Sequence, residues 1–274
     1  MAPATASLAP VDGPEQLRRV AVTRYVLPLR EGGSLPALVE ADDLGTYVLK
    51  FRGAGQGVKA LIAEVIVGEL GRRLGLPVPE VVIARLGADL APAEPDQEVQ
   101  DLLRASVGDN LAMDYLPGSL GLDISVDGVD ADLAAQVLWF DALVQNVDRS
   151  WRNPNLLRWH GGLWLIDHGA ALYFQHNWSA QADPAATAYP GARDHVLLPV
   201  AGSLPAAHAA LAPRVTTALL REVTDLVPDS WLAEDNAFDS AQAARQAYAD
   251  VLAARVASPE AWLEAVEVSR GLRV

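Results

Sequence analysis

The sequence predicts an α+β fold in which a small β-rich first part and a larger, mostly helical second part lie on either side of a cleft. The first part holds short apolar runs, rich in β-forming residues and bounded by glycines, together with one apolar helix. From Val129 onward the apolar residues recur mostly with helical spacing. A chain of 274 residues is long enough for two such lobes. We therefore expect a flexible leader over 1–18, a β-rich lobe over 19–116 and a helical lobe over 117–274.

The expected elements follow from these runs in chain order. The clearest strand, 46–51, is a short β-forming run between glycines. The clearest helix, 58–74, is ended by Gly75 and closed off by two prolines. In full, the sequence predicts strands at 20–29, 37–39, 46–51, 80–85 and 110–114, a hairpin over 155–166, and helices at 58–74, at 131–147 and within 204–227 and 241–269.

The composition excludes several classes of function. The chain has no cysteine, which excludes disulfides, thiolate metal sites and cysteine nucleophiles. Its net charge of −14 argues against nucleic-acid binding, which requires a basic surface. No apolar run approaches the roughly 20 residues of a membrane span, and the N-terminus lacks the features of a secretory signal. We expect a cytoplasmic protein that binds neither nucleic acid nor a membrane.

Three polar residues in the second part have a spacing typical of phosphoryl transfer. Asp148 and Asn153 form the pattern Asp-x-x-x-x-Asn, and Asp167-His168-Gly169 follows after one short hairpin. Kinases use this spacing for a base, a metal-binding amide and a metal-binding carboxylate. Each residue alone is also common in turns, because Asp and Asn hydrogen-bond their own backbone. The three together favour a functional site.

The hairpin between the two motifs is expected to bring these residues together. Two apolar runs flank Gly161-Gly162, which is typical of a hairpin turn. With the turn there, Leu156 lies opposite Asp167, and Asn153 lies slightly beyond the diagonal distance of roughly 7–8 Å. Asn153 must then curl back for its amide oxygen to share a cation with Asp167. Mg²⁺ suits this pair, because it takes oxygen ligands and completes its shell with phosphate and water. Asp148 is expected to face the same space.

Lys50 is the last-but-one residue of the strand at 46–51, and the chain has only one other lysine, Lys59. A kinase needs a lysine at this point to hold the α- and β-phosphates of ATP. The alternative is an edge-strand lysine whose ammonium group reaches solvent. We expect Lys50 to bind phosphate.

A kinase also needs an acid on the following helix to position that lysine. The helix at 58–74 offers Glu64 and Glu69, and periodicity does not decide between them, because the helix is apolar nearly all round. For Glu69 the alternative is a salt bridge along the helix to Arg72 or Arg73.

Two glycine-containing loops compete for the phosphates. Gly32, Gly33 and Ser34 lie between two strands ahead of the lysine, where a kinase loop covers the nucleotide. The loop at 53–57 leads directly into a helix N-terminus, which attracts anions. For adenine, the backbone of Met113, Asp114 and Tyr115 lies at the connection between the two lobes; the alternative is an ordinary interdomain connection.

The residues quoted so far resemble the HipA-like kinases, a bacterial branch of the protein-kinase-like superfamily, over about 20–200. The motif pair is also similar to that of phosphoinositide kinases. The chain is much shorter than full-length HipA toxins and has Asn-Val-Asp-Arg in place of their motif, which leaves an antitoxin partner open. The resemblance is carried by Tyr47-Val-Leu-Lys50-Phe, Ala63-Glu64, Leu74-Gly-Leu-Pro-Val-Pro79, Asn146-Val-Asp148-Arg with Asn153, and Leu165-Ile-Asp167-His-Gly169.

The resemblance implies a two-lobed protein-kinase-like fold and an ATP- and Mg²⁺-dependent phosphotransferase, most simply a serine/threonine protein kinase. It selects Glu64 as the acid that aligns Lys50. In this interpretation Asp148 orients the acceptor hydroxyl, while Asn153 and Asp167 hold Mg²⁺. The phosphoacceptor is an unknown protein or a small molecule. The alternatives are a pseudokinase that serves as a nucleotide-binding regulatory module, and a kinase of small molecules or lipids.

Overall fold

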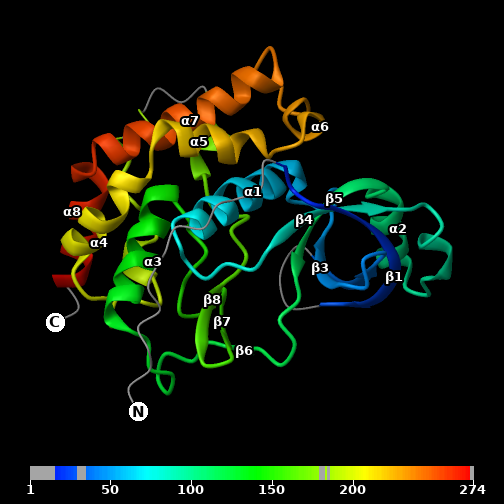
Figure 1. Ribbon diagram of the computed structural model, residues 1–274, viewed down its shortest axis with the longest axis horizontal. Coiled ribbons are helices and arrows are strands. Elements are labelled where there is room, and N and C mark those ends of the chain that lie inside the picture. The colour runs from blue at the N-terminus through cyan, green and yellow to red at the C-terminus, as the bar shows by residue number, and fades with distance from the viewer. Residues whose placement is uncertain (1–15, 30–34, 179–182, 184–185, 272–274) are drawn as a thin grey trace.

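The computed structural model describes residues 16–29, 35–178, 183 and 186–271. Most of the predicted leader and the predicted Gly32-Gly33-Ser34 loop lie outside the described residues. The chain is α+β, with a β-rich N-terminal part and a helical C-terminal part, as the sequence predicts (Figure 1). No helix in the described ranges has both the length and the apolar character needed to cross a membrane.

The five strands of the N-terminal part close into a barrel with the order β1-β2-β3-β5-β4. Strands β1 and β4 are parallel, and the other neighbours are antiparallel. Buried and partly exposed residues alternate along β2 and β3, which points Val39 and Leu49 into the core of the barrel. The sequence located each strand to within two residues but did not predict the closure. The strands are β1 (Arg19–Pro28), β2 (Ala37–Ala41), β3 (Thr46–Lys50), β4 (Val81–Leu86) and β5 (Gly108–Asp114).

A short helix that was not predicted, α2 (Gln97–Ala105), packs against the barrel. The Asp96 side chain caps it by accepting a hydrogen bond from the N–H of Glu98. Only Val99 and Leu103 are buried in it. Two buried residues give a weak periodic signal, so the helix is hard to recognise in the sequence.

The helical part contains the predicted helices, but two of the predicted segments are each divided at a proline. Pro213 lies between α4 and α5, and Pro259 lies between α7 and α8. Proline lacks an N–H and clashes with the preceding turn, so the helix does not continue. Helix α3 ends three residues earlier than predicted, because Gln145 adopts a left-handed conformation with φ 53°. The helices are α3 (Ala131–Val144), α4 (Leu204–Leu211), α5 (Thr217–Asp225), α6 (Asp229–Leu232), α7 (Ala241–Ala257) and α8 (Glu260–Gly271).

Helix α1 (Gly57–Arg73) runs between the barrel and the C-terminal helices and is buried on nearly all sides (Figure 1). Its apolar residues join the larger hydrophobic core, which α3 shares. At its C-terminal end Arg73 forms a 2.6 Å ion pair with Glu222 of α5. The helix is therefore fixed to the helical part of the molecule as well as to the barrel. Both of its carboxylates, Glu64 and Glu69, are fully buried.

The hairpin formed by β7 (Leu156–Trp159) and β8 (Gly162–Leu165), with β6 (Leu120–Gly121) on its edge, is present, but the predicted register is wrong by two residues. Leu156 pairs with Leu165, and the turn consists of His160 and Gly161. Both turn residues have positive φ, 48° and 77°, as a two-residue turn of this type requires. Histidine tolerates that conformation, so the turn does not need both glycines. Asp167 therefore lies beyond the paired strands, not opposite Leu156.

Candidate active site

Lys50, at the end of β3, lies at the centre of a group of charged side chains. Its Nζ contacts the carboxylate of Glu64 on α1 and lies 2.6 Å from Oδ1 of Asp167, just after β8. Glu64 is fully buried, whereas 43% of the Asp167 side chain is exposed. Burial alone would lower the pKa of Lys50, but the charges of Glu64 and Asp167 raise it above its ordinary value. The lysine is therefore charged and is held between the barrel, α1 and the end of the hairpin.

The two acids of α1 have different partners, which separates the alternatives left open by the sequence. Glu64 contacts Lys50, whereas Glu69 forms a 2.9 Å ion pair with Arg72 on its own helix. Burial alone would raise the pKa of Glu64, but Lys50 and His168 lower it well below the usual range, so this buried carboxylate is ionised.

The Asp167-His168-Gly169 segment packs directly against α1. A Cβ placed on Gly169 would lie 3.4 Å from both Glu64 Oε1 and Ala60 Cβ, which shows how closely this segment approaches α1. Nδ1 of the buried His168 lies 3.7 Å from Glu64 Oε2, slightly beyond hydrogen-bond distance. Asp167 itself has φ 55°, a conformation that costs a non-glycine residue roughly 1–3 kcal/mol and that is concentrated at functional sites.

Asp148 lies on the loop between α3 and the hairpin and is held by two asparagines. Its Oδ2 accepts hydrogen bonds from the amides of Asn153 at 2.9 Å and Asn155 at 3.2 Å. Asn155 also donates to the carbonyl oxygen of Asp148 at 2.7 Å, and it has a left-handed φ of 48°. Asn155 was not predicted, although it is visible in the sequence as the second amide of Asn153-Pro154-Asn155.

The expected meeting of Asn153 and Asp167 at the end of the hairpin depended on the wrong register. In the described part of the chain no hydrogen bond joins Asn153 to Asp167, and Asn153 is exposed beside Asp148. Asp167 instead contacts Lys50. The structure thus brings the predicted residues together as two groups, Lys50 with Glu64 and Asp167, and Asp148 with Asn153.

The segment expected to contact adenine lies at the end of β5. The N–H of Asp114 donates to the carbonyl of Glu80 at 2.8 Å, and the N–H of Tyr115 donates to the carbonyl of Thr46 at 3.1 Å. These two donors are thus used inside the protein, and Met113 is buried in the sheet. A ligand at this segment would have to use other backbone groups.

The predicted loop of Gly32, Gly33 and Ser34 lies outside the described residues, so only the competing loop at 53–57 can be described. The N–H of Gly53 donates to Ser106 Oγ at 3.1 Å, and the N–H of Gly57 donates to the carbonyl of Ala54 at 2.8 Å. A Cβ on Gly53 would lie 2.8 Å from the Cβ of Ala105, which explains this glycine by close packing. Local contacts therefore account for these parts of the loop.

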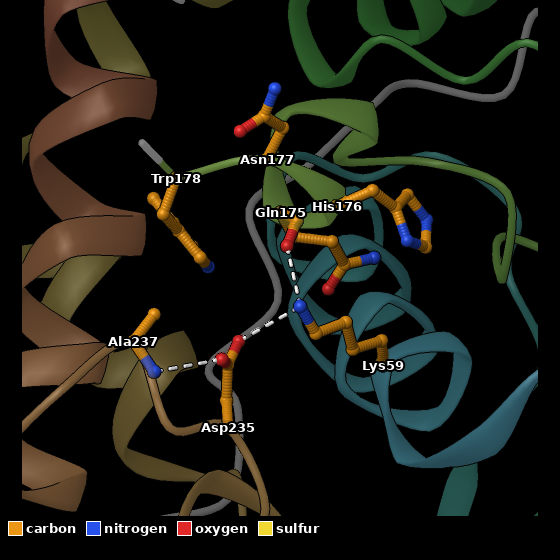
Figure 2. Close-up of a pocket in the computed structure, with 7 residues that line it drawn as sticks. All are labelled: Lys59, Gln175, His176, Asn177, Trp178, Asp235 and Ala237. Atoms are coloured by element: carbon orange, nitrogen blue, oxygen red, sulfur yellow. Dashed lines mark hydrogen bonds and ion pairs between the residues drawn. The ribbon is translucent and has the colours of Figure 1, made fainter. Parts of the chain in front are cut away.

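The second lysine, Lys59, belongs to a separate polar pocket of about 420 Å³ beside α1 (Figure 2). Its Nζ donates to the carbonyl of Gln175 at 2.7 Å and lies 3.0 Å from Asp235 Oδ2. Figure 2 shows the ammonium group between these two partners. Lys59 thus links α1 to the segment that follows Asp167 and to the α6–α7 turn. The pocket is lined by Lys59, Gln175, His176, Asn177, Trp178, Asp235 and Ala237.

The charges around Lys50 fit a bound cation. One ammonium group against two carboxylates leaves an excess of one negative charge, and the more exposed carboxylate, Asp167, is open to solvent. Among the described residues no group of three or more His, Cys, Asp or Glu side chains could hold a metal ion alone. Mg²⁺ does not need such a group, because it is commonly held by one or two carboxylates together with phosphate and water.

Comparison with known proteins agrees with these motifs. A search of the solved structures finds the crystal structure of the golgi casein kinase, which is 12% identical to this chain, with a TM-score of 0.40 and coverage of 89% of this chain and 72% of that one. No curated protein matches significantly. The family model described as HipA-like kinase matches residues 22–265. Because that match spans nearly the whole chain, and includes Lys50, Glu64, Asp148 and Asp167, this protein belongs to the HipA-like kinase family.

Proposed function

We propose that this protein is an ATP- and Mg²⁺-dependent kinase that phosphorylates a serine or threonine hydroxyl of a protein, with the barrel and the helical part acting as two lobes around the nucleotide. The observation that supports it best is the contact of Lys50 with both Glu64 and Asp167. These three side chains come from three separate segments of the chain. A buried, ionised carboxylate that fixes a lysine beside a partly exposed carboxylate is the arrangement that phosphoryl transfer requires.

In the proposed reaction ATP supplies the γ-phosphoryl group, and Mg²⁺ neutralises charge on its phosphates. Lys50, aligned by Glu64, binds phosphate oxygens, and Asp167 holds the metal. Asn153 is proposed as a second metal ligand through its amide oxygen, because its hydrogen bond to Asp148 uses the amide nitrogen. The backbone of 113–115 is proposed to contact adenine through groups other than the N–H of Asp114 and Tyr115.

Asp148 is proposed to orient the acceptor hydroxyl and to accept its proton as the oxygen attacks the γ-phosphorus and the bond to ADP breaks. Its carboxylate is suited to this role because Asn153 and Asn155 hold one oxygen in place. A base held in this way is already oriented toward the reacting group. Such positioning is the main source of rate enhancement in reactions of this kind.

The test is phosphoryl transfer from γ-labelled ATP to the protein itself and to candidate acceptor proteins, in wild type and in Asp167→Ala. We expect Mg·ATP to raise the Tm of the wild type and label to be transferred, and we expect the substitution to reduce transfer by orders of magnitude. Asp101→Ala is the control, because Asp101 is an exposed carboxylate on α2 whose partners, Gln97 and Arg104, lie on the same helix.

Equal transfer by wild type and Asp167→Ala would contradict the proposed mechanism. A rise in Tm with Mg·ATP, without a phosphoryl mass shift on any protein, would instead indicate a nucleotide-binding module. Transfer to a small molecule or lipid, with no labelled protein, would correct the acceptor but retain the chemistry.

A further inference from the structure

Asp141 is the only charged residue in the apolar stretch 133–147 of the sequence, and it is fully buried in α3. A buried carboxylate is costly unless its oxygens are paired and hydrogen-bonded. Nothing in the proposed reaction uses it directly. Asp141 lies in the last turn of the helix that leads to Asp148, where its side chain can position the loop that follows.

Both oxygens of Asp141 are fully engaged. Oδ2 accepts hydrogen bonds from Arg149 Nε at 2.5 Å and His195 Nε2 at 3.0 Å. Oδ1 accepts one from the amide of Asn146 at 3.0 Å. All four side chains are buried, so water does not compete with these contacts. We call Asp141, Arg149 and His195 the buried triad.

The partners of Asp141 lie on both sides of Asp148 in the chain. On the N-terminal side, Asn146 Oδ1 accepts a hydrogen bond from the N–H of Asp148 at 3.2 Å. On the C-terminal side, Arg149 Nη1 donates to the carbonyl of Asn155 at 2.6 Å. Because Asn155 in turn holds Asp148, one buried carboxylate fixes the loop before and after the proposed base.

His195 ties this loop to a distant segment of the chain. The N–H of Leu197 donates to His195 Nδ1 at 3.2 Å, so the ring proton is on Nε2 and is directed to Asp141. Burial lowers the pKa of His195, although Asp141 opposes that shift, so the ring is neutral near pH 7. The backbone joins the same segments, because the N–H of Val196 donates to the carbonyl of Arg149 at 3.0 Å.

We infer that Asp141 and His195 are positioning residues for Asp148, acting through Asn146, Arg149 and Asn155. This inference rests on the proposed function. A base must be held within a fraction of an ångström of the reacting hydroxyl, and a misplacement of about 1 Å can cost roughly 100-fold in rate. Among the described residues no hydrogen bond or ion pair joins the buried triad to Lys50 or Glu64, so its loss should change turnover and leave nucleotide binding intact.

The experiment compares His195→Leu, His195→Gln and Asp141→Asn with His208→Leu. His208 is a suitable control, because it also binds α3, accepting a hydrogen bond from Trp139 Nε1, and in the described ranges no hydrogen bond joins its side chain to the loop at 146–155. For each variant we would measure kcat, KM for ATP, the rise in Tm caused by Mg·ATP, and hydrogen exchange of the peptide covering 146–155.

We expect His195→Leu and Asp141→Asn to lower kcat by roughly 10- to 100-fold, with KM for ATP and the Mg·ATP effect on Tm retained. We expect His195→Gln, whose amide replaces the Nε2 donor, to recover most of kcat, and His208→Leu to match the wild type. Should Asp141→Asn fail to fold, the Leu and Gln variants of His195 still give the test.

A folded His195→Leu variant with wild-type kcat would overturn the inference. A loss of kcat that is explained by weaker ATP binding would also overturn it. The hydrogen-exchange measurement distinguishes failure of the positioning inference from failure of the proposed function. If the wild type transfers no phosphoryl group, the proposed function fails, but faster exchange of 146–155 in His195→Leu than in wild type still supports the positioning role. Unchanged exchange would reject it.

Discussion

Two clusters of charged side chains in the molecule differ in their access to solvent and in their charge balance. The Lys50 cluster is partly open, because 43% of the Asp167 side chain is exposed, and it carries one more negative than positive charge. The buried triad is closed, with Asp141, Arg149 and His195 fully buried and one anion balanced by one cation.

The difference indicates a division of roles. An open cluster with unbalanced charge can exchange partners with an incoming cation and phosphate, so we assign chemistry to it. A closed, balanced cluster cannot do so without exposing a buried charge, which is strongly unfavourable. We therefore assign to the buried triad the positioning of the loop. Substitutions in the Lys50 cluster should lower the rate with little effect on stability, whereas substitutions in the buried triad should lower turnover through the loop, and truncations there should also lower stability.

The largest effect is expected from Asp148→Asn. Removing a general base costs roughly 10²- to 10⁴-fold in rate, and an amide of the same shape preserves the fold. Initial rates of phosphoryl transfer and the Tm measured together would check this prediction. A large fall in Tm with little loss of rate would contradict the assignment of Asp148 as the base.

Next in size is Asp141→Ala. Truncating one partner of a buried ion pair costs roughly 3–5 kcal/mol of stability, because Arg149 is left as an uncompensated buried charge. Urea denaturation of wild type and variant gives the difference in unfolding free energy. We expect a much smaller change in unfolding free energy for Asp167→Ala, because the side chain of Asp167 is partly solvated. Equal losses of stability in the two variants would contradict the distinction between the two clusters.

The two buried acids of α1 provide a matched pair. Glu64→Gln should lower kcat/KM for ATP by roughly 10- to 100-fold, since Lys50 loses the charge that aligns it. Glu69→Gln, a substitution at equal burial on the same helix, should lower it only slightly, because Glu69 pairs with Arg72. Steady-state kinetics with ATP as the varied substrate would check both. Similar losses in the two variants would show that burial of a carboxylate in α1, and not contact with Lys50, is what matters.

A smaller effect is expected in acid. Burial alone would raise the pKa of Asp141, but Arg149 and His195 lower it to about 2, below the ordinary aspartate value of 3.8. The ionised group therefore adds stability that is fully present above about pH 4 and is lost as the pH falls toward 2. That contribution is roughly 2 kcal/mol. Unfolding free energies of wild type and Asp141→Asn at several pH values should converge over this range, and parallel curves would contradict the assignment.

Patterns local in the chain predicted the parts of the fold that depend on neighbouring residues. The strand ending at Lys50, the apolar helix with Glu64, and the loop of Asp148 were each located from a few adjacent residues. The closure of the barrel depends on pairing between distant strands, β1 with β4, which periodicity does not encode.

The parts that were not predicted depend on backbone conformation or on distant contacts. The hairpin register followed from left-handed His160, where the sequence pointed to two glycines, and this moved Asp167 away from Asn153. His195 reaches Asp141 across a sequence separation of 54 residues, with no local pattern to indicate it. Asp141 could have been recognised in the sequence, because it is a single charged residue in an apolar helix.

The most direct test of the account uses the two lysines of the chain, Lys50 and Lys59. Both contact carboxylates and both border α1, but only Lys50 lies in the open cluster. Phosphoryl transfer from γ-labelled ATP would be measured side by side for wild type, Lys50→Met and Lys59→Met, with the Tm of each as a control for folding.

The account predicts a loss of at least about 100-fold for Lys50→Met, because a cation on the transferring phosphate is removed. For Lys59→Met it predicts less than about fivefold, because a partly exposed ion pair contributes roughly 1 kcal/mol at most. Wild-type transfer by a folded Lys50→Met, or equal losses in the two variants, would contradict the assignment of catalysis to the open cluster.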